Sequence, residues 1–259
     1  MDRPDFHRLA PVAGSRLLVI GGFGGIGRAL ATAALDTGLA VWVMDLPEVI
    51  SREPDLGCPT IAVDLRDEAS IKRAFAELSS ATDHLDGIAV CSGYTKGHDS
   101  VAALDTERFD DILSGNLRGP TLALREAVPL LADAARIVVL STAIGQLGAP
   151  GYAAYGAAKA GLNALVRILA AELAPRVTIN GVAPGAVDTA FIRGGKAAGA
   201  SEQGAPARFD VDAYNARIPL GRMAVSEDIV GPLLFLLSDS ARYITGQVLH
   251  VNGGGFMRD

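Results

Sequence analysis

Short apolar segments alternate with longer segments of helical periodicity along the whole chain. Continuous apolar runs rich in β-branched residues predict strands at 16–20, 40–44, 60–63, 87–91, 136–141, 177–182 and 247–251. Strands without polar alternation are typical of parallel sheets that are covered on both faces. Helical patterns lie between them, for example at 27–38, 68–80, 153–174 and 226–238. The alternation predicts an α/β fold: a doubly wound parallel sheet of about seven strands with helices on both faces.

One stretch departs from this alternation of strand and helix patterns. Residues 190–218 are rich in Gly, Ala and Pro and predict a long loop. Loops of this length are usually binding lids or disordered segments. No internal repeat and no linker divides the chain, so we expect a single domain over 1–259 with a substrate lid at about 190–218. An idle insertion is the alternative for this stretch.

Composition excludes several classes of protein. Of the 259 residues, 49% are apolar and 20% are charged, which is a globular composition. The formal charge is −6 and basic residues do not cluster, so we expect no nucleic-acid or membrane partner. No apolar run is long enough to span a bilayer, and the first residues do not resemble a signal peptide. Two cysteines form no disulfide framework, and the four histidines show no metal-ligand spacing, so we expect a cytoplasmic protein without a metal site.

The glycines are in excess, at 30 positions, and five of them fall within residues 21–27. This segment follows the first predicted strand and opens a helix. Glycines at such a turn let the backbone approach a pyrophosphate, which the helix N-terminus then binds through N–H groups. The pattern predicts a Rossmann-type dinucleotide site. The predicted pyrophosphate contacts are Gly21, Phe23, Gly24, Gly25, Ile26 and Gly27.

Asp45 closes the second predicted strand. A carboxylate at this position accepts hydrogen bonds from the adenosine ribose and repels a 2′-phosphate. No Arg or Lys lies inside the glycine segment or next to Asp45 in the sequence, so we expect NAD rather than NADP as the cofactor. An ordinary exposed acid at a strand end is the alternative.

Tyr155 and Lys159 lie one helical turn apart on the same face of a predicted helix. A phenol normally ionises near pH ~10 and is a weak acid or base at neutrality. A nearby ammonium group, together with a positive nicotinamide ring, would lower the pKa of Tyr155. Tyr155 could then exchange a proton with a substrate oxygen while hydride moves at the adjacent carbon.

These features resemble the short-chain dehydrogenase/reductase family over nearly the whole chain. The landmarks that match, in order, are the 21–27 glycine motif, the Tyr155–Lys159 pair, the Pro184-Gly185 turn with Val187 and Thr189, and the closing segment 244–254. The resemblance implies that Asn116 helps to hold a proton-relay water beside Lys159. It also implies further cofactor contacts at Leu46, Asp64, Leu65, Cys91, Ser92, Gly93, Pro184, Gly185, Val187 and Thr189. Asp64 and Leu65 would flank the adenine, and Val187 and Thr189 would hold the nicotinamide carboxamide.

The chain departs from the family pattern at three places. Ile20 replaces the threonine that usually opens the glycine motif, and 90–93 reads Val-Cys-Ser-Gly instead of Asn-Asn-Ala-Gly. Thr142 stands where the family has its catalytic serine, and its hydroxyl can make the same hydrogen bonds. The neighbouring Ser141 competes for that role, but successive strand residues point to opposite faces, so we favour Thr142.

A modestly sized apolar substrate pocket is expected around the reacting groups. Its predicted members are Thr142, Ile144, Tyr152, Ala186 and Ile192. Tyr152 has Gly156 rather than a lysine four positions on, so it is interpreted as pocket wall. Arg193 is the one basic residue that could bind a substrate carboxylate.

These elements predict an NAD(H)-dependent oxidoreductase that interconverts a secondary alcohol and a ketone through Asn116, Thr142, Tyr155 and Lys159. Two alternatives stay open. The first is a 3-oxoacyl reductase acting on carrier-protein or CoA thioesters, although the resemblance associates that activity with NADP. The second is a catalytically silent nucleotide-binding scaffold. The resemblance also implies a homo-oligomer, either a dimer or a tetramer.

Overall fold

The chain folds around one parallel sheet, as seen in a computed structural model that describes residues 9–196 and 206–257. The seven strands are β1 (Arg16–Ile20), β2 (Ala40–Asp45), β3 (Thr60–Ala62), β4 (Leu85–Val90), β5 (Leu131–Leu140), β6 (Thr178–Pro184) and β7 (Val248–Val251). Their order in the sheet is β3-β2-β1-β4-β5-β6-β7, and every neighbouring pair is parallel. The predicted doubly wound fold is confirmed.

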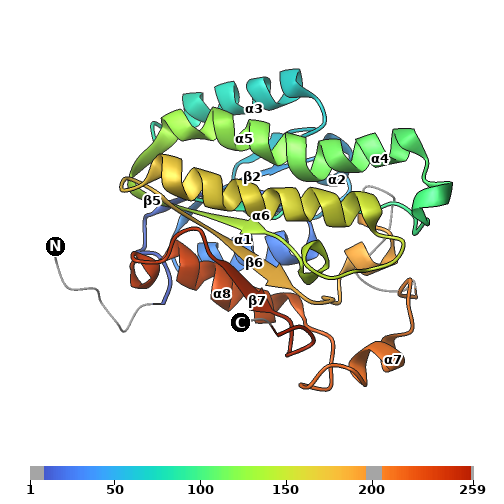
Figure 1. Ribbon diagram of the computed structural model, residues 1–259. Helices are drawn as coiled ribbons and strands as arrows, with labels where there is room; N and C mark the ends of the chain where they lie inside the picture. Colours follow the sequence, from blue (N-terminus) through green and yellow to red (C-terminus); the bar gives the residue numbers. More distant parts are fainter. Residues whose placement is uncertain (1–8, 197–205, 258–259) are drawn as a thin grey trace.

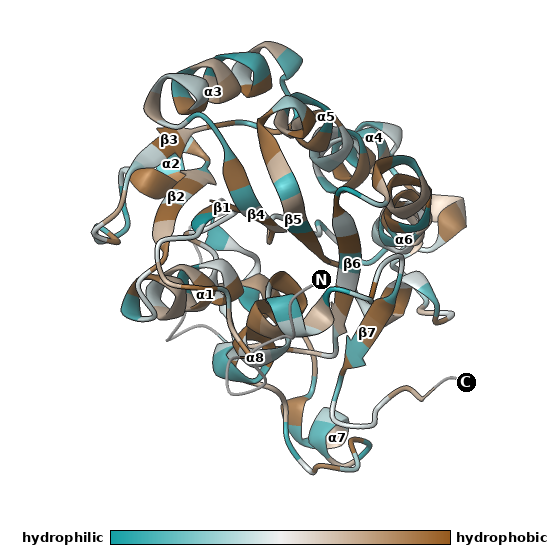
Figure 2. Ribbon diagram, turned by 90° about the vertical axis from the view of Figure 1, so that its left-hand side faces the viewer, coloured by the Kyte–Doolittle hydropathy of each residue, from teal (hydrophilic) through white to brown (hydrophobic). Residues whose placement is uncertain are grey.

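Helices cover both faces of the sheet (Figure 1). They are α1 (Gly25–Asp36), α2 (Pro47–Ile50), α3 (Glu68–Ala81), α4 (Thr106–Leu113), α5 (Gly119–Ala127), α6 (Ala153–Leu173), α7 (Val211–Asn215) and α8 (Ser226–Leu237). Figure 2 shows α3, α4, α5 and α6 on one face and α1 and α8 on the other. A π-helical turn, η2 (Ser114–Arg118), joins α4 to α5, and 3₁₀ turns include η4 (Ala143–Gly145) and η5 (Ala190–Arg193).

Two hydrophobic cores result, one on each face. Successive residues of β1 point to opposite faces, so Leu18 and Ile20 enter the core beneath α3, α5 and α6. Leu17 and Val19 enter the other core, beneath α1 and α8. All four side chains are at most 1% exposed, which explains why the strand is a continuous apolar run.

The order of the strands determines where a ligand can bind. β1 has β2 on one side and β4 on the other, so the chain reverses direction across the sheet at this point. The loops that follow β1 and β4 leave the carboxyl ends of their strands there. A ligand crevice is expected at such a switch point in an open α/β sheet.

Most element boundaries differ from the predictions by one or two residues, and two differences are larger. β5 begins at Leu131, because Leu131 pairs with Leu85 ahead of a register shift in the β4–β5 ladder. The predicted loop at 190–218 contains η5 and α7, while residues 197–205 lie outside the described part of the chain. None of the described helices is long and apolar enough to cross a membrane.

Candidate active site

The glycine segment forms a tight turn between β1 and α1. Gly21 has φ +81°, and a Cβ there would lie 2.6 Å from the Ser92 backbone nitrogen. A Cβ on Gly27 would collide with the Gly21 carbonyl oxygen. The N-cap Gly24 offers no side chain to the first turn of α1, so the N–H groups of that turn are left for another partner. This turn therefore forms a backbone cradle in which Gly21 and Gly27 cannot be replaced by larger residues.

Asp45 is held against this cradle. Its Oδ2 accepts a hydrogen bond from the Phe23 backbone N–H, and its Oδ1 accepts one from Leu46, both at 2.8 Å. Burial raises the pKa of the carboxyl group, while these two bonds oppose the rise. The carboxylate is therefore fixed in orientation at the end of β2, beside the predicted pyrophosphate turn.

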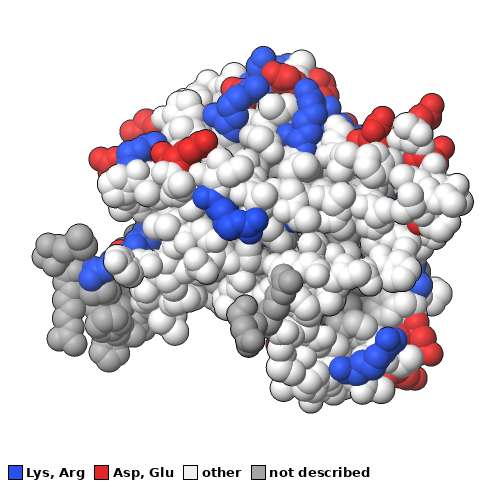
Figure 3. Space-filling model, viewed as in Figure 1, with Lys and Arg blue, Asp and Glu red and all other residues white. Residues whose placement is uncertain are grey.

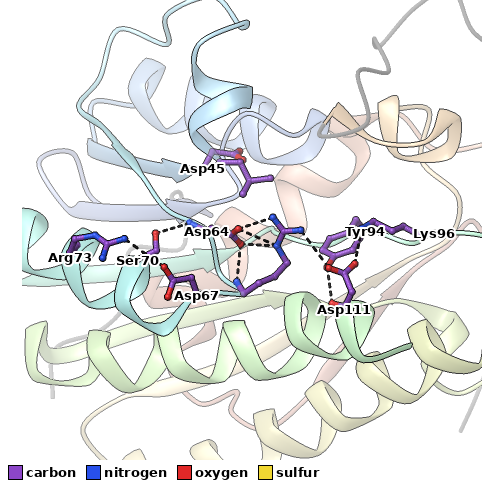
Figure 4. A network of polar contacts seen from close by, with 10 residues as sticks. Asp45, Asp64, Asp67, Ser70, Arg73, Tyr94, Lys96 and Asp111 are labelled. Atoms are coloured by element: carbon purple, nitrogen blue, oxygen red, sulfur yellow. Dashed lines mark hydrogen bonds and ion pairs between the residues drawn. The ribbon is translucent and has the colours of Figure 1, made fainter. Parts of the chain in front are cut away.

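Asp64 follows β3 and belongs to a network of charged groups (Figure 4). Arg66 bonds Asp64 at 2.7 Å and reaches Asp111 at 3.4 Å, and Lys96 bonds Asp111 at 2.8 Å. The hydrogen bonds from Arg66 lower the pKa of Asp64. Leu65 is buried, and a Cβ on Gly119 would collide with its carbonyl oxygen. Arg66 was not identified from the sequence, because only the fold brings Asp111 to it.

The turn after β4 crosses the centre of the site. A Cβ on Gly93 would meet Asn116 Oδ1 at 3.1 Å and Lys159 Nζ at 3.2 Å, so these two groups lie against the same residue. Ser92 Oγ is buried without a hydrogen-bond partner in the described part of the chain. Burial raises the pKa of the Cys91 thiol to about 12, which makes it a poor nucleophile.

Asn116 lies in the π-helical turn between α4 and α5 and is fully buried. Its Oδ1 accepts a bond from the Tyr94 backbone N–H at 3.0 Å. Its Nδ2 donates to the carbonyl oxygens of Tyr94 and Ile112, each at 2.9 Å. The side chain thus ties the turn after β4 to α4. Single π-helical turns within longer helices often mark functional positions.

Tyr155 and Lys159 come together on α6 as predicted. Both are buried, Lys159 Nζ lies 5.8 Å from the centre of the Tyr155 ring, and it donates a 2.8 Å bond to the Leu140 carbonyl. Burial lowers the pKa of Lys159 to about 8.

The protein's own groups do not lower the pKa of Tyr155, and the fall predicted with a bound nicotinamide ring stays a prediction. Burial of the ring raises this pKa, and Tyr152 adds to the rise. The physical reason is that a buried phenolate loses its hydration, and this loss exceeds the attraction of an ammonium group that is itself desolvated.

The hydroxyl groups of Thr142 and Ser141 have different surroundings, as expected for successive residues at the end of a strand. Ser141 Oγ donates to Asn163 Oδ1 at 2.5 Å, and both residues are buried. Thr142 caps the 3₁₀ turn η4, where its Oγ1 accepts a 3.3 Å bond from the Ile144 N–H. The Ser141 hydroxyl is thus committed to the interior, and the Thr142 hydroxyl can still donate.

An aromatic and aliphatic cluster surrounds Tyr155. Ile144, Tyr152 and Phe191 pack in it, and the Phe191 and Tyr155 ring centres are 5.8 Å apart. Ile144 and Tyr152 were predicted as pocket residues, whereas Phe191 was missed and the neighbouring Ile192 was chosen from the same stretch. Tyr152 also contacts His98, with ring centres 4.4 Å apart.

The other two predicted pocket residues have different surroundings. The Ala186 N–H donates to the Tyr214 hydroxyl at 2.8 Å, and Ile192 is buried with its carbonyl bonded to the Arg208 N–H. Neither residue belongs to the apolar cluster around Tyr155 in the described part of the chain. Arg193 bonds Asp188 and the Thr189 carbonyl, so its guanidinium is held within its own turn.

The turn after β6 carries the remaining predicted cofactor residues. Pro184 ends β6, and a Cβ on Gly185 would lie 2.8 Å from the Tyr214 hydroxyl. Val187 and Thr189 are buried, and the Thr189 hydroxyl donates to the Val187 carbonyl at 3.4 Å. Tyr214 fixes this turn from α7, and no sequence motif marked it.

Comparison with known proteins agrees with this arrangement. A family model described as "Enoyl-(Acyl carrier protein) reductase" matches residues 21–255. The chain is 33% identical over 250 residues to the 3-oxoacyl-(acyl-carrier-protein) reductase FabG of Aquifex aeolicus, covering 92% of this chain and 96% of that protein. It is 32% identical to FabG of Staphylococcus aureus, covering 93% and 97% of the two chains.

Several solved structures also have a similar fold. A short-chain dehydrogenase/reductase of the glucose/ribitol dehydrogenase type from Brucella melitensis superposes with a TM-score of 0.84 at 26% identity, covering 96% and 99% of the two chains. The Pseudomonas aeruginosa RhlG/NADP active-site complex gives 0.81 at 27% identity, covering 95% and 97%. Because the family model and these relatives span nearly the whole chain, the protein belongs to the short-chain dehydrogenase/reductase family.

Proposed function

We propose that this oxidoreductase uses NAD(H) and interconverts a secondary alcohol and a ketone, with Tyr155 as the general acid and base. The observation that carries the proposal is the meeting of Asn116 and Lys159 at Gly93, with Tyr155 one helical turn from Lys159. Perturbed pKa values of buried groups that lie close together are typical of functional sites.

The residues fit a dinucleotide. The backbone cradle at 21–27 has no room for a side chain at Gly21 or Gly27, and the buried Ser92 hydroxyl lacks a partner among the described residues. In this proposal the cradle holds the pyrophosphate, Asp45 the adenosine ribose, and Asp64 with Leu65 the adenine. The turn with Val187 and Thr189 holds the carboxamide. When bound, the nicotinamide would supply the hydride chemistry.

In this proposal, side chains of the protein transfer the proton to or from the substrate oxygen. Thr142 donates a hydrogen bond to the substrate oxygen, and Tyr155 exchanges the proton with that oxygen. Since burial favours the neutral phenol, the protein by itself favours Tyr155 as a proton donor, which suits ketone reduction. Lys159 stabilises the phenolate left behind, and Asn116 holds the turn against which Lys159 packs.

A panel of ketones and secondary alcohols tests this function, with NADH and NADPH compared under identical conditions. We expect turnover with a higher kcat/KM for NADH. Tight binding of NADH without turnover of any substrate would favour a nucleotide-binding scaffold and overturn the proposed reaction.

A second candidate is reduction of a 3-oxoacyl thioester. The names of the FabG relatives favour it. Acetoacetyl-CoA and an acetoacetyl carrier protein belong in the same panel. A kcat/KM for these thioesters well above that for simple ketones would replace the first candidate by this one.

We also propose that the chain forms a homo-oligomer. A groove of about 440 Å³ runs along α4, η2 and α5, and it contains Leu113, Leu117 and Leu122. The surface over α6 carries few charged side chains (Figure 3). A monomeric mass by light scattering would contradict this proposal.

A further inference from the structure

The fold brings two cations to the neighbourhood of Asp45, although none is adjacent in the sequence. The Arg28 guanidinium lies over the Phe23 ring, 5.1 Å from its centre, and the Phe23 N–H donates to Asp45. Lys196, at the end of the described part of the lid, lies near enough to Asp45 to lower its pKa. The sequence argument that no basic residue could reach a 2′-phosphate here is therefore incomplete.

Glu53 binds both cations. Its Oε2 lies 2.8 Å from Lys196 Nζ and 3.2 Å from Arg28 Nη2. The Lys196 side chain is only 9% exposed, so this pair is well shielded from water and salt. Arg28 also donates to the Pro54 carbonyl at 3.1 Å. One carboxylate thus joins α1, the segment after α2 and the lid.

The cluster contains a donor that Glu53 does not satisfy. Arg28 Nε is buried and has no hydrogen-bond partner among the described residues. Guanidinium and ammonium groups are the usual protein partners of phosphate, through charge-assisted hydrogen bonds. The cluster is therefore a potential phosphate site whose cations are held by an internal acid.

We propose that Glu53 is a positioning residue for cofactor selection: by holding Arg28 and Lys196, it keeps them from a ribose 2′-phosphate and so reinforces the preference for NAD. Asp45 acts directly, through its charge and its acceptor oxygens, whereas Glu53 acts through the two cations. The inference rests on the proposed function, because it assumes that the adenosine ribose lies beside Asp45.

Binding of nucleotide fragments tests this inference without any substrate. Titration calorimetry would measure the affinities of 5′-AMP and 2′,5′-ADP, which differ only by the 2′-phosphate, for the full chain and for Glu53→Gln. We expect Glu53→Gln to raise the ratio of 2′,5′-ADP to 5′-AMP affinity about tenfold at low salt. The gain should shrink at high ionic strength, because the Arg28 side chain is partly exposed and salt screens its attraction to the phosphate.

Glu48→Gln is the matched control. Glu48 lies on α2 near Asp45, and it forms no ion pair with either cation in the described structure. An unchanged ratio in Glu53→Gln, or an equal rise in Glu48→Gln, would overturn the role of Glu53.

A second pair of variants leaves Glu53 in place. If the cations receive the phosphate, Asp45→Ala combined with Lys196→Gln should bind 2′,5′-ADP several-fold more weakly than Asp45→Ala alone, with 5′-AMP unaffected. Equal binding by the two would contradict the inference. If the unaltered chain bound 5′-AMP but neither Glu53→Gln nor the added Lys196→Gln changed the ratio, only this inference would fail. If it bound neither fragment nor NADH, the proposed function would fail with it.

Discussion

The end of the site that contains Tyr155 and Lys159 differs from the end that contains Asp45 and Asp64 in how its charged groups meet water. Tyr155 and Lys159 are buried. Burial raises the pKa of Tyr155 and lowers the pKa of Lys159, so it favours the neutral form of both side chains. Asp45 and Asp64 are half-buried and are held by backbone N–H groups or by a guanidinium. Burial prepares the first end for proton transfer, whereas fixed charge at the second end suits selection of a ligand.

The largest expected effect is at the buried end. Tyr155→Phe should lower kcat by about 10²–10⁴-fold, because it removes the proposed proton donor. The NADH dissociation constant, measured by fluorescence, should stay within about twofold. Tyr152→Phe is the control and should keep most of the activity, since Tyr152 is proposed as pocket wall. Near-normal kcat in Tyr155→Phe would remove Tyr155 from the mechanism.

Thr142 and Ser141 provide a sharper comparison between adjacent hydroxyls. Thr142→Ala should lower kcat by about 100-fold, because the substrate oxygen loses a donor. Ser141→Ala should keep kcat but reduce the free energy of unfolding by about 1–2 kcal/mol, since Asn163 loses its buried partner. The reverse pattern in kinetics and chemical denaturation would assign catalysis to Ser141.

At the half-buried end, Asp45→Ala should change selectivity more than turnover. We expect the NADH-to-NADPH ratio of kcat/KM to fall about tenfold or more, because the carboxylate no longer repels a 2′-phosphate. Steady-state kinetics with both cofactors measures this ratio. A ratio that did not move would mean that the selectivity lies elsewhere.

The lowered pKa of Lys159 predicts a dependence of stability on pH. In the unfolded chain Lys159 titrates near its usual value of 10.5, and in the cofactor-free fold it titrates at about 8. Between these values the unfolded state binds more protons, so the contribution of Lys159 to stability rises as the pH increases above 8. The free energy of unfolding, measured by chemical denaturation between pH 7.5 and 9.5, should show this rise. The Lys159→Met variant should lack it. Equal pH slopes for the two proteins would show that Lys159 keeps an ordinary pKa.

The smallest effect is expected at the exposed network around Asp64. Arg66→Gln should raise the KM for NADH only a few-fold, leave kcat unchanged and alter the free energy of unfolding by less than ~1 kcal/mol, because ion pairs this exposed are weak. A loss of kcat comparable to that in Thr142→Ala would mean that this network supports the buried end.

Local sequence patterns predicted the fold well, because strand and helix periodicities are set by near neighbours. The seven apolar runs correspond to seven strands, and the turn at 21–27 has the tight geometry that its glycines indicate. The spacing of Tyr155 and Lys159 was sufficient to place them on one helical face, because the helical repeat brings residues four apart together.

The sequence by itself thus determined the sheet, the glycine cradle and the paired Tyr155 and Lys159. Only the tertiary structure decided that Glu53 holds Arg28 and Lys196, that Phe191 packs on Tyr155, and that the pKa of Tyr155 rises. The reason is physical. Helical and strand periodicity act over a few residues, whereas burial and charge depend on segments that meet only after the chain has folded.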